Sequence, residues 1–171
     1  MADADGSDGS GQGSEFVVEL PLADAPAEPA GVPGIAPSLR AQRLLVVEDH
    51  EDAREGLRLL LAASGHAVQV AADGPTGLEL LRAWRPDIAL VDIGLPGLDG
   101  YAFARAVRAD SSIAGTLLVA LTGYGQPEDR RQALAAGFDA HVVKPVRPEG
   151  LARTLASLAA ARDDRPGRGG S

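Results

Sequence analysis

Residues 86–100 read PDIALVDIGLPGLDG, and this stretch decides the predicted fold. An apolar run of strand length fills 88–91, with a Pro-Asp turn signal before it and a Gly-Leu-Pro-Gly turn at 94–97 after it. An uninterrupted apolar run is typical of a parallel strand that helices cover on both faces. The stretch therefore predicts a buried strand that ends at the carboxylate of Asp92.

Apolar runs of similar length recur along the chain and alternate with segments of helical period. The runs are LLVV at 44–47, AVQV at 67–70, IALV at 88–91, TLLVAL at 116–121 and HVV at 141–143. Five such units predict an α/β fold with a doubly wound, five-stranded parallel sheet. The more polar run AVQV is expected at an edge of the sheet, and the other four runs are expected to be covered on both faces. Ala133 and Leu134 mark the fourth helix, which should end at Gly137.

The two ends of the chain differ in composition from these units. A chain of 171 residues is long enough for one ordinary domain. The N-terminal residues are rich in Gly, Ser, Asp, Pro and Ala, a composition that favours disorder or an extended linker. We therefore expect a folded domain over 43–161 between two disordered tails, at 1–42 and 162–171. A strand-like run lies within the first tail at 16–22.

The composition excludes several classes of protein and site. The chain has no cysteine, so it cannot form a disulfide or bind a metal through thiolates. No run approaches the roughly 18 apolar residues of a membrane-spanning helix, and the acidic N-terminus is unlike a secretory signal. We therefore expect a soluble, cytoplasmic protein with no membrane partner.

The net charge of −8 is concentrated near the N-terminus, where residues 1–40 hold seven acidic residues and one basic residue. The predicted domain is therefore almost neutral, and its arginines are scattered instead of forming the basic cluster typical of a nucleic-acid-binding surface. The polar, glycine-rich residues 162–171 are not expected to form a DNA-binding output either. We expect no direct binding to nucleic acid.

Polar residues stand at the predicted carboxyl ends of four strands. They are Glu48 and Asp49, Asp92, Thr122, and Lys144 followed by Pro145. Ligands of open α/β sheets bind beyond these strand ends. Each residue alone has an ordinary structural interpretation, as a turn residue, a helix cap, a strand-end hydroxyl or a solvated charge. Their common position at one edge of the sheet predicts a site.

The chemistry of this set favours phosphoryl transfer with a metal ion. Converging carboxylates repel one another unless a cation joins them, and Mg²⁺ prefers oxygen ligands. Lys144 is the only lysine in the chain, and its compact ammonium differs from the planar guanidinium used at every other basic position. A metal, an ammonium and a hydroxyl would together stabilise a transferred phosphoryl group. Asp92, which is central in the set, is the predicted nucleophile.

Four stretches together resemble the receiver domain of bacterial response regulators, a CheY-like (βα)5 domain with the flavodoxin-like fold. They are LLVVEDHEDARE from residue 44, PDIALVDIGLPGLDG from 86, VALTGYG from 119 and GFDAHVVKPV from 137. The resemblance implies a protein of two-component phosphorelay signalling that takes a phosphoryl group from the phosphohistidine of a histidine kinase. It also implies that phosphorylation alters a face that binds a downstream protein, formed by the fourth and fifth βα segments at about 122–147.

The resemblance further implies roles for the acidic residues and for Gly94. Asp92 would be the phosphorylation site. Asp49, Asp92 and the backbone carbonyl of Gly94 would bind Mg²⁺, and Glu48 would support the metal through water. The acidic pair is Glu-Asp here instead of the more common Asp-Asp, and this variant should keep metal binding.

The same resemblance assigns the residues after the fourth and fifth strands. Thr122 and Lys144 would contact the phosphoryl group, and the bond between Lys144 and Pro145 is expected to be cis. His141 stands where many receivers have Tyr or Phe as the switch residue. His141 therefore replaces the aromatic ring that is usually coupled to the hydroxyl at the position of Thr122.

Other interpretations of the residues remain open. An enzyme such as a phosphohydrolase with an aspartyl phosphate generally has a second Asp two residues after the nucleophile, where this chain has Gly94. We therefore expect no enzyme. A degenerate receiver that only binds is disfavoured by the intact set of acids, hydroxyl and lysine. His50 and His66 are expected at the surface, and Trp84 is expected to pack at the end of the second helix.

Residues 10–22, SGQGSEFVVELPL, resemble the end of the ATP-binding domain of a histidine kinase. That resemblance implies a remnant of a hybrid histidine kinase, joined originally to this receiver. The alternative is a disordered tail with a chance apolar run. One strand cannot bury a core of its own, so no ATP binding is expected from this segment.

Overall fold

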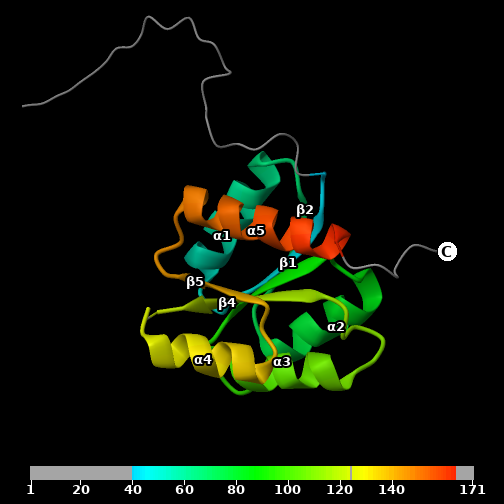
Figure 1. Ribbon diagram of the computed structural model, residues 1–171, viewed down its shortest axis with the longest axis vertical. Coiled ribbons are helices and arrows are strands. Elements are labelled where there is room, and N and C mark those ends of the chain that lie inside the picture. The colour runs from blue at the N-terminus through cyan, green and yellow to red at the C-terminus, as the bar shows by residue number, and fades with distance from the viewer. Residues whose placement is uncertain (1–39, 124, 165–171) are drawn as a thin grey trace, which may run out of the picture. The chain divides into compact units, whose positions relative to one another are not determined.

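The computed structural model describes residues 40–123 and 125–164. In this part of the chain five strands alternate with five helices (Figure 1). The strands are β1 (Arg43–Val47), β2 (Ala67–Ala71), β3 (Ile88–Asp92), β4 (Leu117–Thr122) and β5 (Ala140–Val143). The helices are α1 (Glu51–Ala63), α2 (Gly74–Trp84), α3 (Gly100–Ala109), α4 (Pro127–Ala136) and α5 (Pro148–Asp163). The last helix thus continues past residue 161, the predicted end of the domain, whereas the strand-like run at 16–22 lies outside the described residues.

The five strands form one parallel sheet in the order β2-β1-β3-β4-β5. This confirms the predicted doubly wound α/β fold. The chain first winds outward from β1 to β2 and then returns to β3 on the other side of β1, so the crevice beyond β1 and β3 is the switch point of the topology. No described helix has the length and apolar character needed to span a membrane.

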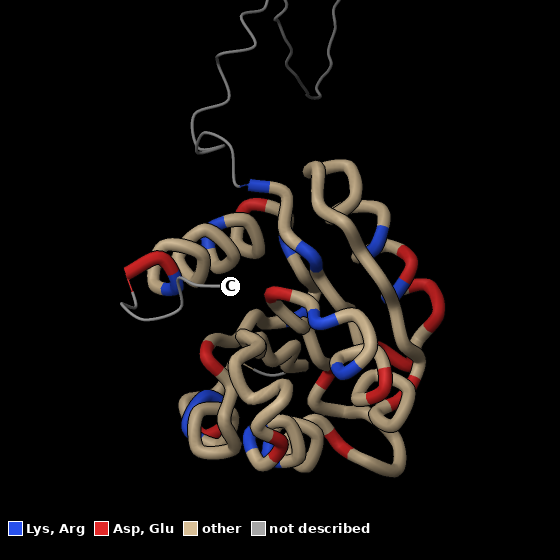
Figure 2. The backbone as a smooth tube through the Cα atoms, turned by 90° about the vertical axis from the view of Figure 1, so that its right-hand side faces the viewer, with Lys and Arg blue, Asp and Glu red and all other residues tan. Residues whose placement is uncertain are grey.

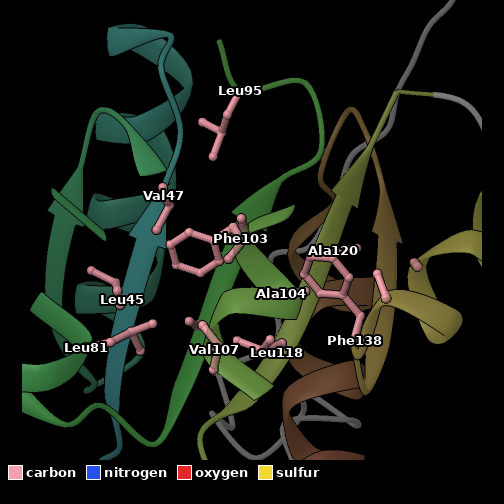
Figure 3. Packing of buried hydrophobic residues seen from close by; sticks show 14 of the residues in the cluster. Leu45, Val47, Leu81, Leu95, Phe103, Ala104, Val107, Leu118, Ala120 and Phe138 are labelled. Carbon is pink, nitrogen blue, oxygen red and sulfur yellow. The ribbon is translucent and has the colours of Figure 1, made fainter. Parts of the chain in front are cut away.

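Helices cover both faces of the sheet, with α1 and α5 on one face and α2, α3 and α4 on the other (Figure 1). Successive side chains of a strand point to opposite faces, so β1 contributes to two cores. Leu45 and Val47 join the cluster beneath α2, α3 and α4, and Leu44 and Val46 join the cluster beneath α1 and α5. Figure 3 shows the ring of Phe103 from α3 against Val47. This double coverage explains why β1 reads as a continuous apolar run.

The two edges of the sheet differ from the prediction in one respect. β2 lies at an edge, as its polar sequence predicted. β5 contacts α5 on one face and α4 on the other, as expected, but it is the other edge of the sheet and is only partly buried, with Val143 38% exposed. α4 contains Ala133 and Leu134 as predicted, with Ala133 buried and Leu134 51% exposed. Apolar character in a short segment does not reveal how many neighbours that segment has.

Three helix ends follow their local signals. The carboxylate of Asp73 accepts a hydrogen bond from the backbone N–H of Thr76 at 2.8 Å and caps α2. Asp99 caps α3 in the same way through the N–H of Ala102 at 2.8 Å. Gly137 ends α4 as predicted, with a φ of 116° that favours glycine. The cap at Asp99 fixes the start of α3 directly after the loop that follows Asp92.

Two further side chains test the predictions made for the surface. Trp84 ends α2 and is half-buried, with the guanidinium of Arg43 5.8 Å from the centre of its ring, so boundary packing is confirmed. His66 was expected at the surface, and that expectation is wrong, since it is only 6% exposed. Its Nδ1 accepts a hydrogen bond from the backbone N–H of Gln42 at 3.3 Å. Burial lowers the pKa of His66, which favours the neutral ring that this hydrogen bond requires.

The contact between α3 and the end of β3 leaves no room for a side chain at Gly100. A Cβ there would lie 2.7 Å from both the carbonyl oxygen of Asp92 and the Cα of Ile93, which are backbone atoms. We expect Gly100→Ala to lower the free energy of unfolding by about 1–3 kcal/mol, the usual cost of forcing an extra carbon into a packed region. Urea unfolding measures this change.

Gly56 in α1 is the matched control for that substitution. It is exposed, and a Cβ built on it would meet nothing within 4 Å. Gly56→Ala should therefore raise the free energy of unfolding by about 0.5–1 kcal/mol, because alanine favours the interior of a helix. Equal effects of the two substitutions would show that the close approach at Gly100 is not what matters.

Candidate functional site

The acidic pair follows β1 and begins the loop that leads into α1. The side chain of Glu48 is fully buried, and that of Asp49 is 29% exposed. Arg54 in the first turns of α1 holds this loop, because its Nη1 donates to the carbonyl oxygens of Glu48 at 2.9 Å and of Asp49 at 3.2 Å. The sequence analysis missed Arg54. Its only signal was an arginine six residues after the first acid, which is common on any helix.

Asp92 is the last residue of β3 and is 7% exposed. The backbone N–H of Gly94 donates to its Oδ1 at 3.1 Å, so the loop after β3 orients the carboxylate. β3 lies next to β1, with Val91 paired in register with Val47. The pairing brings Asp92 and Glu48 to the same end of adjacent strands, as the sequence predicted.

Lys144 follows β5 and reaches across the strand ends. Its Nζ donates to Glu48 Oε2 at 2.6 Å and lies 3.2 Å from Asp92 Oδ1. Its backbone N–H donates to the carbonyl oxygen of Thr122 at 2.7 Å, and the peptide bond from Lys144 to Pro145 is cis, as expected. The structure thus joins three of the predicted site residues, from β1, β3 and β5, in one cluster.

Opposing effects act on the pKa of Lys144. Burial favours the neutral amine and lowers the pKa, whereas the hydrogen bond to Glu48 and the negative charges of Asp92 and Glu48 raise it. The carboxylates outweigh burial, so the pKa lies above its ordinary value of 10.5. Lys144 is therefore a cation at neutral pH, placed between two carboxylates.

Two polar atoms of the site have no hydrogen-bond partner within the described residues. They are Oγ1 of Thr122, whose residue is 3% exposed, and Oδ1 of Asp49. Thr122 is the last residue of β4 and follows Leu121, the register partner of Asp92. Buried polar atoms normally make hydrogen bonds, so a hydroxyl and a carboxylate oxygen that make none at this edge fit a site for a ligand or an ion.

His141 lies apart from this cluster. It is half-buried on β5 and lines a surface groove with the start of α4. Arg130, Arg131 and Leu134 line the same groove. His141 therefore lies in the groove between β5 and α4, beside the exposed Leu134, and not in the cluster of Glu48, Asp92 and Lys144.

A family model for the response regulator receiver domain matches residues 44–156. This match covers most of the chain and contains every predicted site residue. The chain belongs to the response regulator receiver family. It is a receiver domain of the two-component signalling type, which confirms the family predicted from the sequence.

Known proteins agree with this assignment. The receiver domain is 39% identical over 104 residues to the transcriptional regulatory protein AfsQ1 of Streptomyces coelicolor, a match that covers 61% of this chain and 45% of that protein. It therefore spans about half the length of the curated relatives it matches. The chemotaxis response regulator CheY4 of Vibrio cholerae has a similar structure, with a TM-score of 0.66, 31% identity, and coverage of 70% of this chain and 99% of that one.

A second structure bears on metal binding. The receiver domain of a sensor histidine kinase from Pseudomonas aeruginosa, solved with a magnesium ion in its active-site cleft, has a TM-score of 0.65 and 30% identity to this receiver domain. The match covers 71% of this chain and 99% of that one. The clustered carboxylates and the unpartnered Asp49 oxygen show that the residues present here fit such an ion.

Proposed function

We propose that this receiver domain accepts a phosphoryl group on Asp92 from the phosphohistidine of a histidine kinase. The observation that carries the proposal is the cluster of Asp92, Glu48 and Lys144 at the strand ends. In this step a carboxylate oxygen of Asp92 bonds to phosphorus as the bond from phosphorus to the kinase imidazole nitrogen breaks. The electron pair of the broken bond stays on that nitrogen, which then takes up a proton.

We propose that Asp49, Asp92 and the backbone carbonyl of Gly94 hold Mg²⁺, with Glu48 as its support through water. Support comes from the buried Glu48 and Asp92, from the Asp49 oxygen that makes no hydrogen bond within the described residues, and from the magnesium ion in the Pseudomonas receiver structure. When bound, Mg²⁺ would offset the negative charge of the carboxylates and of the phosphoryl oxygens.

The remaining site residues would stabilise the phosphoryl group. The ammonium of Lys144 lies 3.2 Å from Asp92 Oδ1, so it is close enough to pair with the oxygens of a phosphoryl group bound to that carboxylate. The hydroxyl of Thr122, buried without a partner, can donate to a phosphoryl oxygen. These groups are in place before the reaction, and such preorganised charge is the main contribution that a protein makes to phosphoryl transfer.

Labelling with a small-molecule phosphodonor tests the proposal. We expect the full chain to gain one phosphoryl group in the presence of Mg²⁺, to lose this reactivity when a chelator is added, and to carry the modification on Asp92 by peptide mass spectrometry. Fluoroberyllate should bind at the same residue. Labelling that maps to another residue, or that persists at full extent in the chelator, would contradict the assignment.

The output surface proposed here is the face from Thr122 to Arg147. It includes the groove between α4 and β5 and two exposed apolar side chains, Leu134 and Val143. Exposed apolar groups beside a groove favour contact with a protein. Lys144 links this face to the acidic cluster, because it follows Val143 in the chain and binds Glu48 through its ammonium. Phosphorylation at Asp92 would thus change the partner-binding face through Lys144.

We propose a cytoplasmic signalling module without enzymatic turnover or direct DNA binding. Gly94 offers no general acid two residues after Asp92, which argues against a phosphohydrolase. In the described residues, basic and acidic positions interleave along the helices and loops instead of forming one basic surface (Figure 2).

We also propose that the receiver descends from a hybrid histidine kinase. The support is the resemblance of residues 10–22 to the end of a kinase ATP-binding domain, together with the structural likeness to the receiver of a Pseudomonas sensor histidine kinase. Those residues lie outside the described part of the chain. The same kinase would then be the natural phosphodonor of Asp92.

A further inference from the structure

His50 places a nitrogen ligand directly beside the acidic pair. Its Nδ1 lies 3.2 Å from Asp49 Oδ1 and 3.4 Å from Glu48 Oε1. One ligand atom from each of the three residues lies within 4.8 Å of the other two. The imidazole is 77% exposed, so it stands at the rim of the crevice while the carboxylate of Glu48 is buried. The role assigned to the acidic residues in phosphoryl transfer does not use this ring.

These separations suit neighbouring ligands of a single ion. Two ligands held about 2.1 Å from an octahedral ion, at right angles, lie about 3 Å apart. The contact between His50 and Asp49 is close in distance, yet Asp49 Oδ1 makes no hydrogen bond within the described residues. The short approach of the ring nitrogen to this oxygen is therefore not a hydrogen bond.

A separate observation points to a ligand at the same edge of the sheet. Thr122 ends another strand and is only 3% exposed, and its buried Oγ1 has no hydrogen-bond partner within the described residues. Lys144 donates to Oε2 of Glu48, whereas Oε1 accepts a hydrogen bond from the backbone N–H of His50 at 3.3 Å and lies 3.4 Å from its Nδ1. Glu48 is thus held by the ammonium of Lys144 on one oxygen and by the backbone of His50 on the other, with the imidazole close to that second oxygen.

We propose that this crevice also accepts a divalent transition-metal ion that favours nitrogen, of the class of Ni²⁺, with His50 as the added ligand. The inference rests on the proposed metal site and deepens it. Mg²⁺ takes oxygen ligands and keeps several waters, whereas imidazole suits Ni²⁺, Zn²⁺ and Fe²⁺. His50 would therefore set the choice of metal without altering the carboxylates that both kinds of ion share.

A purely electrostatic role for His50 makes the opposite prediction. A protonated imidazole would pair with Glu48 and Asp49 as a cation and would repel any divalent ion. Its removal would then leave the affinities for Mg²⁺ and Ni²⁺ unchanged, or raise both. Ligation predicts a loss that is confined to the ion that favours nitrogen.

Calorimetric titration of the full chain with Ni²⁺ and with Mg²⁺ separates these roles. His50→Asn removes the proposed ligand. His141→Asn is the matched control, because His141 lies apart from the site in the groove between α4 and β5. Asp49→Asn tests whether each ion binds at the acidic pair. Asn is a good residue for the N-cap position that His50 occupies at α1, so the fold should be kept. Even residues that only orient a ligand contribute about 10- to 100-fold to metal affinity, so we expect His50→Asn to lose at least about tenfold in Ni²⁺ affinity.

The expected result is that loss of Ni²⁺ affinity in His50→Asn, with Mg²⁺ affinity unchanged and with His141→Asn like the wild type for both ions. Equal weakening for both ions, or no weakening for Ni²⁺, overturns the role of His50 as a ligand. Even if the role of His50 is overturned, the metal site of the proposed function stands as long as the wild type binds Mg²⁺ and Asp49→Asn does not. Mg²⁺ binding that is indifferent to Asp49→Asn would instead overturn the metal site of the proposed function.

Discussion

Asp92→Asn is expected to abolish phosphodonor labelling at every Mg²⁺ concentration. The Asn amide is not a nucleophile at neutral pH, whereas the Asp92 carboxylate is held by the N–H of Gly94 beside the ammonium of Lys144. The change is small in volume and leaves the hydrogen bond from Gly94 possible. Intact-mass spectrometry over a range of Mg²⁺ concentrations gives the labelled fraction.

Asp49→Asn is the control that separates the acceptor from the metal ligand. It keeps the carboxylate of Asp92 but removes one charge from the metal site, so labelling should fall at low Mg²⁺ and recover as the concentration rises. Both variants remove a single negative charge from the same crevice. If raising Mg²⁺ restored labelling of Asp92→Asn, or if the two variants had the same dependence on Mg²⁺, Asp92 would not be the acceptor.

Lys144→Met should destabilise the protein in the absence of a metal ion and make it more responsive to Mg²⁺. The substitution keeps the apolar stem but removes the ammonium that lies 2.6 Å from the fully buried Glu48. Removing one member of a buried ion pair costs about 3–5 kcal/mol, and the partial exposure of Lys144 reduces our expectation to about 2–3 kcal/mol. Mg²⁺ should recover part of this loss, because a divalent ion can replace the missing positive charge.

The pKa of Lys144 fixes the pH range in which this effect should be measured. Because that pKa is raised above 10.5, the ammonium contributes its full stabilisation below pH 10.5 and loses it only as the pH rises through the higher value. The difference between wild type and Lys144→Met should therefore be constant across neutral pH. Urea unfolding at neutral pH, with Mg²⁺ and with chelator, measures both parts of the prediction.

Lys144→Arg is the matched control, since it keeps the positive charge. We expect its stability to be closer to that of the wild type, but its response to phosphorylation to be impaired, because a planar guanidinium does not replace a compact ammonium between two carboxylates. The ion-pair account would fail if Lys144→Met were as stable as the wild type without metal. A fully normal phosphorylation response in Lys144→Arg would remove any specific role for the ammonium.

Much of the fold could be predicted from local patterns. The runs at 44–47 and 88–91 are apolar throughout because helices cover β1 and β3 on both faces, and the polar run at 67–70 lies at the edge that it predicted. The last strand shows the limit of this reasoning. Helices contact both faces of β5, as its apolar residues 141–143 predicted, but β5 has a neighbouring strand on one side only and is therefore only partly buried. The number of neighbours depends on strand order, which local sequence does not contain.

The membership of the site could be predicted for a related reason. In a parallel sheet, the residue that follows each strand lies at the same edge, so Asp92, Thr122 and Lys144 could be grouped before any distance was known. Their partners within the group could not be predicted in this way. That Lys144 binds Glu48 at 2.6 Å and Asp92 at 3.2 Å follows from where the three side chains meet across β1, β3 and β5.

The sequence by itself thus determined the α/β fold, the set of polar strand ends and the family, because these depend on period and spacing along the chain. The tertiary structure alone decided that Arg54 holds the acidic loop, that His66 is buried and that the imidazole Nδ1 of His50 lies 3.2 Å from Asp49 Oδ1. The physical reason is that a side chain's burial and contacts depend on segments that are distant in sequence and meet only when the sheet and its helices pack.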